Sequence, residues 1–182
     1  LASCAGEGTV RTAGEATSPS RPAADGASSA SPTQAGPRRQ RRAADPELAA
    51  YIRDHYVKSE HQIPMRDGAK LFTIVYSPKD ASPSRTYPFL MTRTPYSIGP
   101  YGPEDYRASL GPSDAYARDG YIFVYQDVRG CYMSEGAFVN MTPHIDDKKS
   151  PSDVDESSDA YDTIDWLLAN IPNHNGRVGL YG

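Results

Sequence analysis

The last eight residues, NGRVGLYG, combine features that could belong to a nucleophilic site. They read as a strand that begins at Arg177 and reaches a glycine, Gly182. In one class of hydrolytic site a strand ends in G-x-S-x-G and turns sharply into a helix, which lifts the serine hydroxyl above the sheet. Gly182 has the place of the first glycine. We therefore expect a nucleophile elbow to start here, with its serine two residues beyond the chain.

A second polar group follows the apolar run YIFVYQDVRG. Asp127 and Arg129 stand at the end of this stretch, after its apolar part at 121–125, where catalytic side chains often lie. We interpret them instead as a buried or half-buried salt link that shapes a loop. Gly130 belongs to the same loop, and Glu135 and Gly136 complete it.

The histidines and Cys131 are weak candidates for catalytic or metal-binding residues. The four histidines are poor general bases because the chain order expected for this kind of site is Ser, Asp, His; they are His55, His61, His144 and His174. No pair has metal-ligand spacing with a matching carboxylate, so neither a metal nor another cofactor is expected. Cys131 is interpreted as a small buried residue.

Residues 1–45 differ sharply from the rest. They consist mostly of Ala, Gly, Ser, Thr, Pro and Arg and contain no Ile, Phe, Tyr or Trp. Such a segment cannot bury enough apolar surface to offset its ordering entropy, so it is predicted to be a disordered tail or linker. Its basic run at 38–42 has no interleaved aromatic residues to stack on bases, which argues against a nucleic-acid partner.

The first four residues, LASC, resemble the end of a bacterial lipoprotein signal. Cleavage before Cys4 would leave a thiol for lipid attachment, and a flexible spacer would suit an anchored protein. This interpretation predicts a periplasmic or cell-envelope location with membrane anchoring through the N-terminus. The alternative is a frayed terminus with a chance cysteine.

Residues 46–182 carry the periodic patterns of a folded domain. A short helix is expected from Pro46, then two extended runs around the hairpin signal Asp67-Gly68. Strands follow at 89–93, over YIFVYQDVRG and from Arg177 to Gly182. Helices are expected at 114–118, ended by Gly120, and over SSDAYDTIDWLLANIP, capped by Ser157 or Ser158 and stopped by Pro172. In this last helix Tyr161, Ile164, Leu167 and Leu168 form the apolar stripe.

This order is a hairpin followed by alternating strands and helices. Alternation indicates right-handed crossovers and a parallel sheet, whereas the hairpin indicates an antiparallel edge. The fold class is therefore α/β, as the N-terminal portion of an α/β-hydrolase core. Residues 46–182 would be an incomplete domain that ends at the nucleophile elbow.

Five segments, in this order, resemble the family of X-prolyl dipeptidyl peptidases, cocaine esterase and α-amino-acid ester hydrolases: PMRDG, TRTPY, YQDVRGCYMSEGAF, DAYDTIDWL and NGRVGLYG. The polar insert before the last helix is most similar to the ester hydrolase branch. The resemblance covers about Tyr56 to Gly182. It implies a serine hydrolase with an α/β-hydrolase core, an inserted helical cap and a C-terminal jelly-roll.

One catalytic residue of the family matches within this chain. The tyrosine of the turn after the third strand donates its hydroxyl to the oxyanion, and that position is Tyr96, in Thr94-Pro95-Tyr96. The serine, aspartate and histidine of the triad would all follow Gly182, so we expect the chain alone to be inactive.

The resemblance thus implies an acyl-enzyme hydrolase of small-molecule α-amino-acid esters or related amides, which could form a homo-oligomer at full length. An X-prolyl dipeptidyl peptidase is the alternative within the family. A non-catalytic remnant or binding module is the alternative outside it.

Overall fold

The computed structural model describes residues 45–140 and 142–182. The predicted tail, Cys4 included, therefore lies outside the described residues except for Asp45, which is the N-cap of the first helix. Three helices and five strands follow one another in the order α1 (Pro46–His55), β1 (Tyr56–Pro64), β2 (Lys70–Pro78), β3 (Tyr87–Thr94), α2 (Asp114–Asp119), β4 (Ile122–Asp127), α3 (Glu156–Asn170) and β5 (His174–Leu180). None of the helices in this part of the chain is long and apolar enough to cross a membrane.

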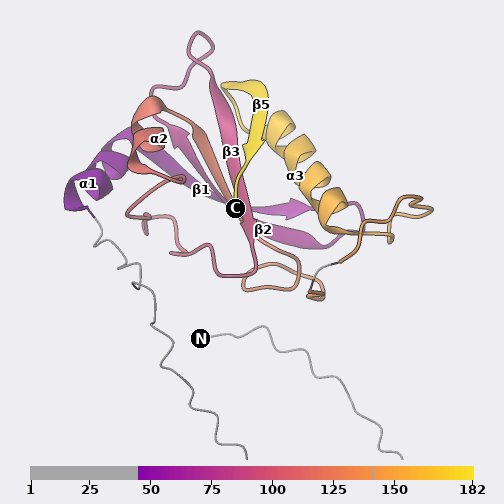
Figure 1. The fold of residues 1–182 in the computed structure, drawn as a ribbon. Helices are drawn as coiled ribbons and strands as arrows, with labels where there is room; N and C mark the ends of the chain where they lie inside the picture. The colour runs from indigo at the N-terminus through magenta and orange to yellow at the C-terminus, as the bar shows by residue number, and fades with distance from the viewer. Residues whose placement is uncertain (1–44, 141) are drawn as a thin grey trace, which may run out of the picture. The chain divides into compact units, whose positions relative to one another are not determined.

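The strands form one mixed sheet in the order β1-β2-β4-β3-β5 (Figure 1). β1 and β2 are antiparallel, as are β2 and β4, whereas β3 is parallel to both β4 and β5. The expected hairpin followed by parallel strands is confirmed. Gly68 sits in the hairpin turn with φ +90°, a value that favours glycine.

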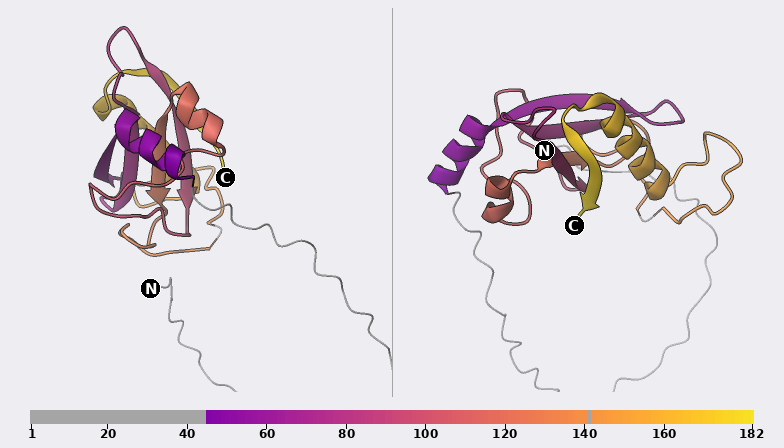
Figure 2. Two further views of the ribbon diagram at one scale, coloured as in Figure 1. Left: turned by 90° about the vertical axis from the view of Figure 1, so that its left-hand side faces the viewer. Right: turned by 90° about the horizontal axis from the view of Figure 1, so that it is seen from above.

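Two layers of side chains cover the sheet. The α1 and α2 side holds the cluster Leu48, Ile52, Tyr56, Phe72, Ile74, Tyr76, Ile98, Leu110, Ala117, Phe123 and Tyr125. The α3 side holds Ile63, Met65, Leu71, Val75, Tyr87, Phe89, Met91, Ile122, Val124, Leu167 and Ile171. Figures 1 and 2 show α1 and α2 on one side of the strands and α3 on the other. All six residues of β4 are buried, as its apolar run predicts.

The start of α3 differs from the prediction. Asp155, rather than Ser157 or Ser158, is the N-cap, and its carboxylate accepts the Ser158 N–H at 2.8 Å. The Ser158 hydroxyl accepts the Asp155 N–H in return, which completes a capping box. A serine that looks like a cap can thus serve as the third helical residue instead.

The predicted apolar stripe of α3 is also partly wrong. Tyr161 is 66% exposed and Leu168 is 37% exposed, whereas Asp159, Thr163 and Leu167 face the sheet. The reason is a buried polar contact, in which the Gln126 amide donates to the Thr163 hydroxyl at 2.8 Å. This contact turns the 159–163–167 face of the helix toward β4.

Candidate active site at the carboxyl ends of β3, β4 and β5

The three parallel strands end at the same edge of the sheet, which is where open α/β sheets bind ligands. A cleft of about 300 Å³ opens there. It is lined by Thr92, Thr94, Tyr96, Ser97, Ile98, Arg107, Ser109, Gly111, Tyr125 and Tyr181. The cleft therefore brings Tyr96 together with Tyr181, the neighbour of Gly182.

Tyr96 projects from the turn after β3. Its side chain is 81% exposed, and its backbone N–H donates to the Thr94 hydroxyl at 3.0 Å. The next residue, Ser97, has φ +24°, an unusual value for a residue other than glycine. An exposed phenol on a constrained turn at this edge is available to donate to a bound ligand.

The loop that follows Tyr96 is held by two cations. The Arg107 guanidinium donates to the carbonyls of Ile98 and Gly99 at 2.8 and 2.9 Å and lies 4.4 Å from the Tyr125 ring centroid. The Lys58 ammonium, on β1, is fully buried and donates to three loop carbonyls, those of Pro100, Gly102 and Asp105.

Glu60 completes the Lys58 arrangement. Its carboxylate lies 2.8 Å from the Lys58 ammonium and accepts the Gly102 N–H at 2.7 Å. Sequence reasoning missed Lys58, Glu60 and Arg107. No local pattern could reveal Lys58, because its carbonyl partners lie 42 to 47 residues away along the chain.

Asp127 does not form the predicted salt link with Arg129. Its side chain is fully buried and accepts three hydrogen bonds, from the Ile98 N–H at 3.1 Å, the Tyr101 hydroxyl at 2.9 Å and the Met133 N–H at 3.4 Å. Burial raises the pKa of Asp127 above its ordinary value. The prediction was wrong because the chain turns directly after β4, so that Asp127 and Arg129 face different elements.

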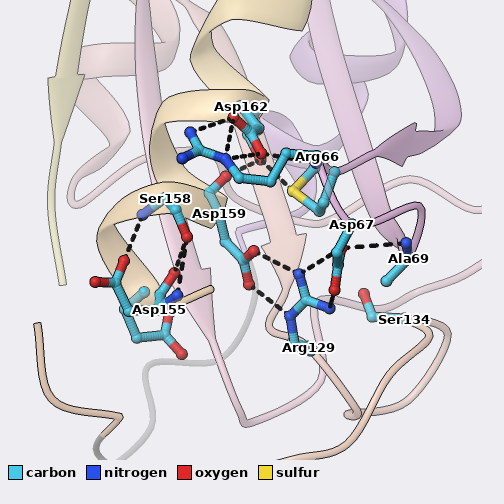
Figure 3. Close-up of polar contacts among 12 residues, drawn as sticks. Arg66, Asp67, Ala69, Arg129, Ser134, Asp155, Ser158, Asp159 and Asp162 are labelled. Carbon is cyan, nitrogen blue, oxygen red and sulfur yellow. Dashed lines mark hydrogen bonds and ion pairs between the residues drawn. The ribbon is translucent and has the colours of Figure 1, made fainter. Parts of the chain in front are cut away.

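Arg129 pairs with two other carboxylates (Figure 3). Its guanidinium binds Asp159 of α3 through two hydrogen bonds of 2.7 and 3.0 Å. It also binds Asp67 of the hairpin turn at 2.7 Å. The hydrogen bonds to Asp159, despite the opposing effect of burial, raise the pKa of Arg129. Arg129 thus joins the hairpin, the loop after β4 and α3.

Gly130, Glu135 and Gly136 do belong to one loop. The Gly130 N–H donates to the Glu135 carbonyl at 3.0 Å, and the Glu135 N–H donates to the Lys70 carbonyl at 2.9 Å. A Cβ on Gly130 would lie 2.1 Å from the Phe138 nitrogen, so only glycine fits. The loop is therefore pinned to the start of β2.

Gly182 lies just past the last hydrogen bond of β5, which runs from the Tyr181 N–H to the Met91 carbonyl at 3.0 Å. β5 itself ends at Leu180, slightly earlier than predicted. Burial raises the pKa of the Tyr181 phenol. The strand thus delivers Gly182 to the edge that carries Tyr96, and the elbow stays a prediction.

None of the histidines lines the cleft. His61 lies beside the Ser59 hydroxyl at 2.8 Å, and His174 beside the Leu168 carbonyl at 3.0 Å. Within residues 45–140 and 142–182 no group of three His, Cys, Asp or Glu side chains could hold a metal ion. Cys131 is fully buried, as expected.

Comparisons with known proteins identify the family of the chain. Residues 67–182 match the X-Pro dipeptidyl-peptidase (S15 family). The chain belongs to that family. Cocaine esterase from Rhodococcus sp. (strain MB1 Bresler) is a family relative with 34% identity over 131 residues, which are 71% of this chain and 19% of the esterase.

Two solved structures of hydrolytic enzymes have a similar fold in the region that this chain covers. An aminopeptidase from a marine sediment Thaumarchaeota archaeon has 37% identity and a TM-score of 0.59, over 79% of this chain and 23% of that protein. An α-amino acid ester hydrolase has 40% identity and a TM-score of 0.58, over 81% of this chain and 24% of that protein. The described fold is thus the N-terminal portion of an α/β-hydrolase core, and the chain spans about a quarter or less of the length of each of these three relatives.

Proposed function

We propose that this chain supplies the oxyanion-binding part of a serine hydrolase that cleaves α-amino-acid esters or related amides through an acyl-enzyme. The observation that carries the proposal is the position of Tyr96. Its phenol stands exposed on a constrained turn, in a cleft shared with the residue that precedes Gly182.

In the proposed reaction a serine beyond Gly182 attacks the acyl carbon of the substrate. A histidine takes the serine proton and returns it to the leaving alcohol or amine, while an aspartate orients that histidine. The former carbonyl oxygen becomes an anion in the tetrahedral intermediate. Tyr96 donates a hydrogen bond to this oxygen. When the intermediate collapses to the acyl-enzyme, the oxygen becomes a neutral carbonyl again and the hydrogen bond weakens. Water then attacks the acyl-enzyme by the same steps and releases the acid.

The relatives support two candidate substrate classes. The 40% identity to an α-amino acid ester hydrolase supports α-amino-acid esters and their amide analogues. The match to the X-Pro dipeptidyl-peptidase family favours a second candidate, a peptidase that removes X-Pro dipeptides. A comparison of phenylglycine methyl ester with an Ala-Pro p-nitroanilide as substrates of the full-length gene product separates the two, and faster turnover of the ester supports the first.

The test of Tyr96 uses the full-length gene product. Tyr96→Phe removes one oxyanion donor, a change that typically raises the barrier by about 3–4 kcal/mol, so kcat should fall about 10²–10³-fold. Tyr161→Phe is the matched control, because Tyr161 is 66% exposed on α3 and does not line the cleft. Equal turnover of the Tyr96 variant and the wild type would remove Tyr96 from the mechanism.

We further propose a cell-envelope location through lipid attachment at Cys4, which the LASC sequence supports. Growth of the native host on a labelled fatty acid tests this. Label on the wild type and none on a Cys4→Ser variant is the expected result, and an unlabelled wild type contradicts it.

A further inference from the structure

Asp127 is a buried carboxylate without a cationic partner among the described residues. Its side chain has no exposed surface, and its three hydrogen bonds come from two backbone N–H groups and one phenol. A buried charge is costly unless hydrogen bonds satisfy it. Two carboxylate oxygens can accept all three donors at once, whereas an asparagine side chain has one acceptor oxygen.

The three donors lie in two loops: Ile98 and Tyr101 are in the loop after β3, and Met133 is in the loop after β4. Oδ1 accepts from the Ile98 N–H, two residues after Tyr96. Oδ2 accepts from the Tyr101 hydroxyl and the Met133 N–H. Asp127 therefore joins the turn that bears Tyr96 to the loop after β4.

A second contact anchors the other end of the same turn. The Val128 N–H, adjacent to Asp127, donates to the Thr94 carbonyl at 3.2 Å. The Tyr101 hydroxyl also lies 3.0 Å from the hydroxyl of Ser97, the residue of positive φ that follows Tyr96. Thus both ends of the Thr94–Ile98 turn are tied to the end of β4, so the backbone from which the Tyr96 phenol projects is held in place.

We infer that Asp127 is a positioning residue for Tyr96, because it holds the turn from which the Tyr96 phenol reaches the cleft. This inference rests on the proposed function of Tyr96. Stabilisation of an oxyanion depends on a donor held in place before the reaction, and a misplacement of 1 Å can cost about 10²-fold in rate. The Tyr101 hydroxyl donates to Asp127 at 2.9 Å, and burial raises the pKa of Tyr101 further above neutral pH, to about 12.

A double-mutant cycle in the full-length gene product tests the inference. The variants are Asp127→Asn, Tyr96→Phe and the double variant, and kcat and KM are measured for each with the amino-acid ester. Asp127→Asn should lower kcat by about 10–100-fold and change KM by less than about threefold. The double variant should be no slower than Tyr96→Phe alone, within about threefold, because direction is irrelevant once the hydroxyl is gone.

The outcomes separate the two proposals. If Tyr96→Phe lowers kcat and the effect of Asp127→Asn is fully retained in the double variant, Asp127 acts independently of Tyr96 and the inference is overturned. If Tyr96→Phe leaves kcat unchanged, the proposed function of Tyr96 fails and the inference fails with it.

Tyr101→Phe carries the test if Asp127→Asn does not fold. This change removes only the hydroxyl that bonds Asp127 and Ser97, and it keeps the ring beside Phe72. It should lower kcat by about tenfold in the wild-type background and have no effect in the Tyr96→Phe background. A Tyr101→Phe variant that melts like the wild type and retains full kcat overturns the inference.

Discussion

Replacing Arg129 by methionine should destabilise the chain far more than removing an exposed ion pair does. Arg129 is the bidentate partner of Asp159, whose side chain is 3% exposed. Without the guanidinium, this carboxylate keeps its ion pair with Arg93 at 3.8 Å. Removal of one partner of a buried pair typically costs about 3–5 kcal/mol. Because Arg93 remains, we expect a loss near the lower end, about 3 kcal/mol.

The matched control is Arg85→Met. Arg85 pairs with Asp80 at 2.8 Å, but these side chains are 64% and 53% exposed, so the loss should be below about 1 kcal/mol. Urea unfolding of the chain 1–182 can be followed through Trp166, the single tryptophan. Trp166 lies on α3, against the His61 ring at 5.1 Å between centroids, and it therefore reports on the contact between the helix and the sheet.

A third variant tests the cause. In Arg129→Met/Asp159→Leu both charges are replaced by apolar side chains, and buried pairs replaced in this way are often close to neutral. The double variant should therefore recover part of the stability that Arg129→Met loses, because Asp67 still lacks Arg129 while Arg93 keeps its ion pair with Glu156. A loss for Arg129→Met within about 1 kcal/mol of the Arg85→Met value, or no recovery in the double variant, would refute the reasoning.

Two further predictions concern the loop after β4 and acid stability. Gly130→Ala should lower the free energy of unfolding by about 3–5 kcal/mol, because the left-handed φ of +70° adds about 1–2 kcal/mol to the strain of a Cβ placed 2.1 Å from backbone. Gly68 has φ +90° but open space around it, so Gly68→Ala should cost only about 1–2 kcal/mol. Equal urea midpoints for the two variants would contradict this prediction. Burial opposes the charged forms of Asp155 and Asp162, but hydrogen bonds from Lys148 and Arg66 outweigh it and hold both pKa values below the ordinary 3.8. Both groups therefore stabilise the fold above about pH 4, and the free energy of unfolding should fall as the pH drops below that value; a constant urea midpoint from pH 6 to pH 3 would exclude this.

The course of the chain could be predicted from local patterns. The Asp67-Gly68 turn, the buried run of β4 and the glycine that ends α2 each depend on nearby residues, and the structure confirms them. Local signals determine where an element exists, because turn geometry and hydrophobic period act over a few residues.

The polar partners could not be predicted in the same way. Asp127 and Arg129 have opposite charges two residues apart, which suggested a pair, yet the turn after β4 directs one toward Ile98 and the other toward Asp159. Long-range contacts such as these depend on how the elements pack. The same holds for α3, where the contact between Thr163 and Gln126 decides which face is buried.

The most direct test of the central claim, that Tyr96 binds the oxyanion, is the affinity of the full-length gene product for phenylboronic acid. A boronic acid bonded to the serine proposed to follow Gly182 would be tetrahedral and would place an oxygen where the oxyanion forms, and analogues of this kind bind through contacts made in the transition state. Tyr96→Phe should raise the dissociation constant by about 10²–10³-fold, in parallel with its loss of kcat. Equal dissociation constants for Tyr96→Phe and the wild type would contradict the claim.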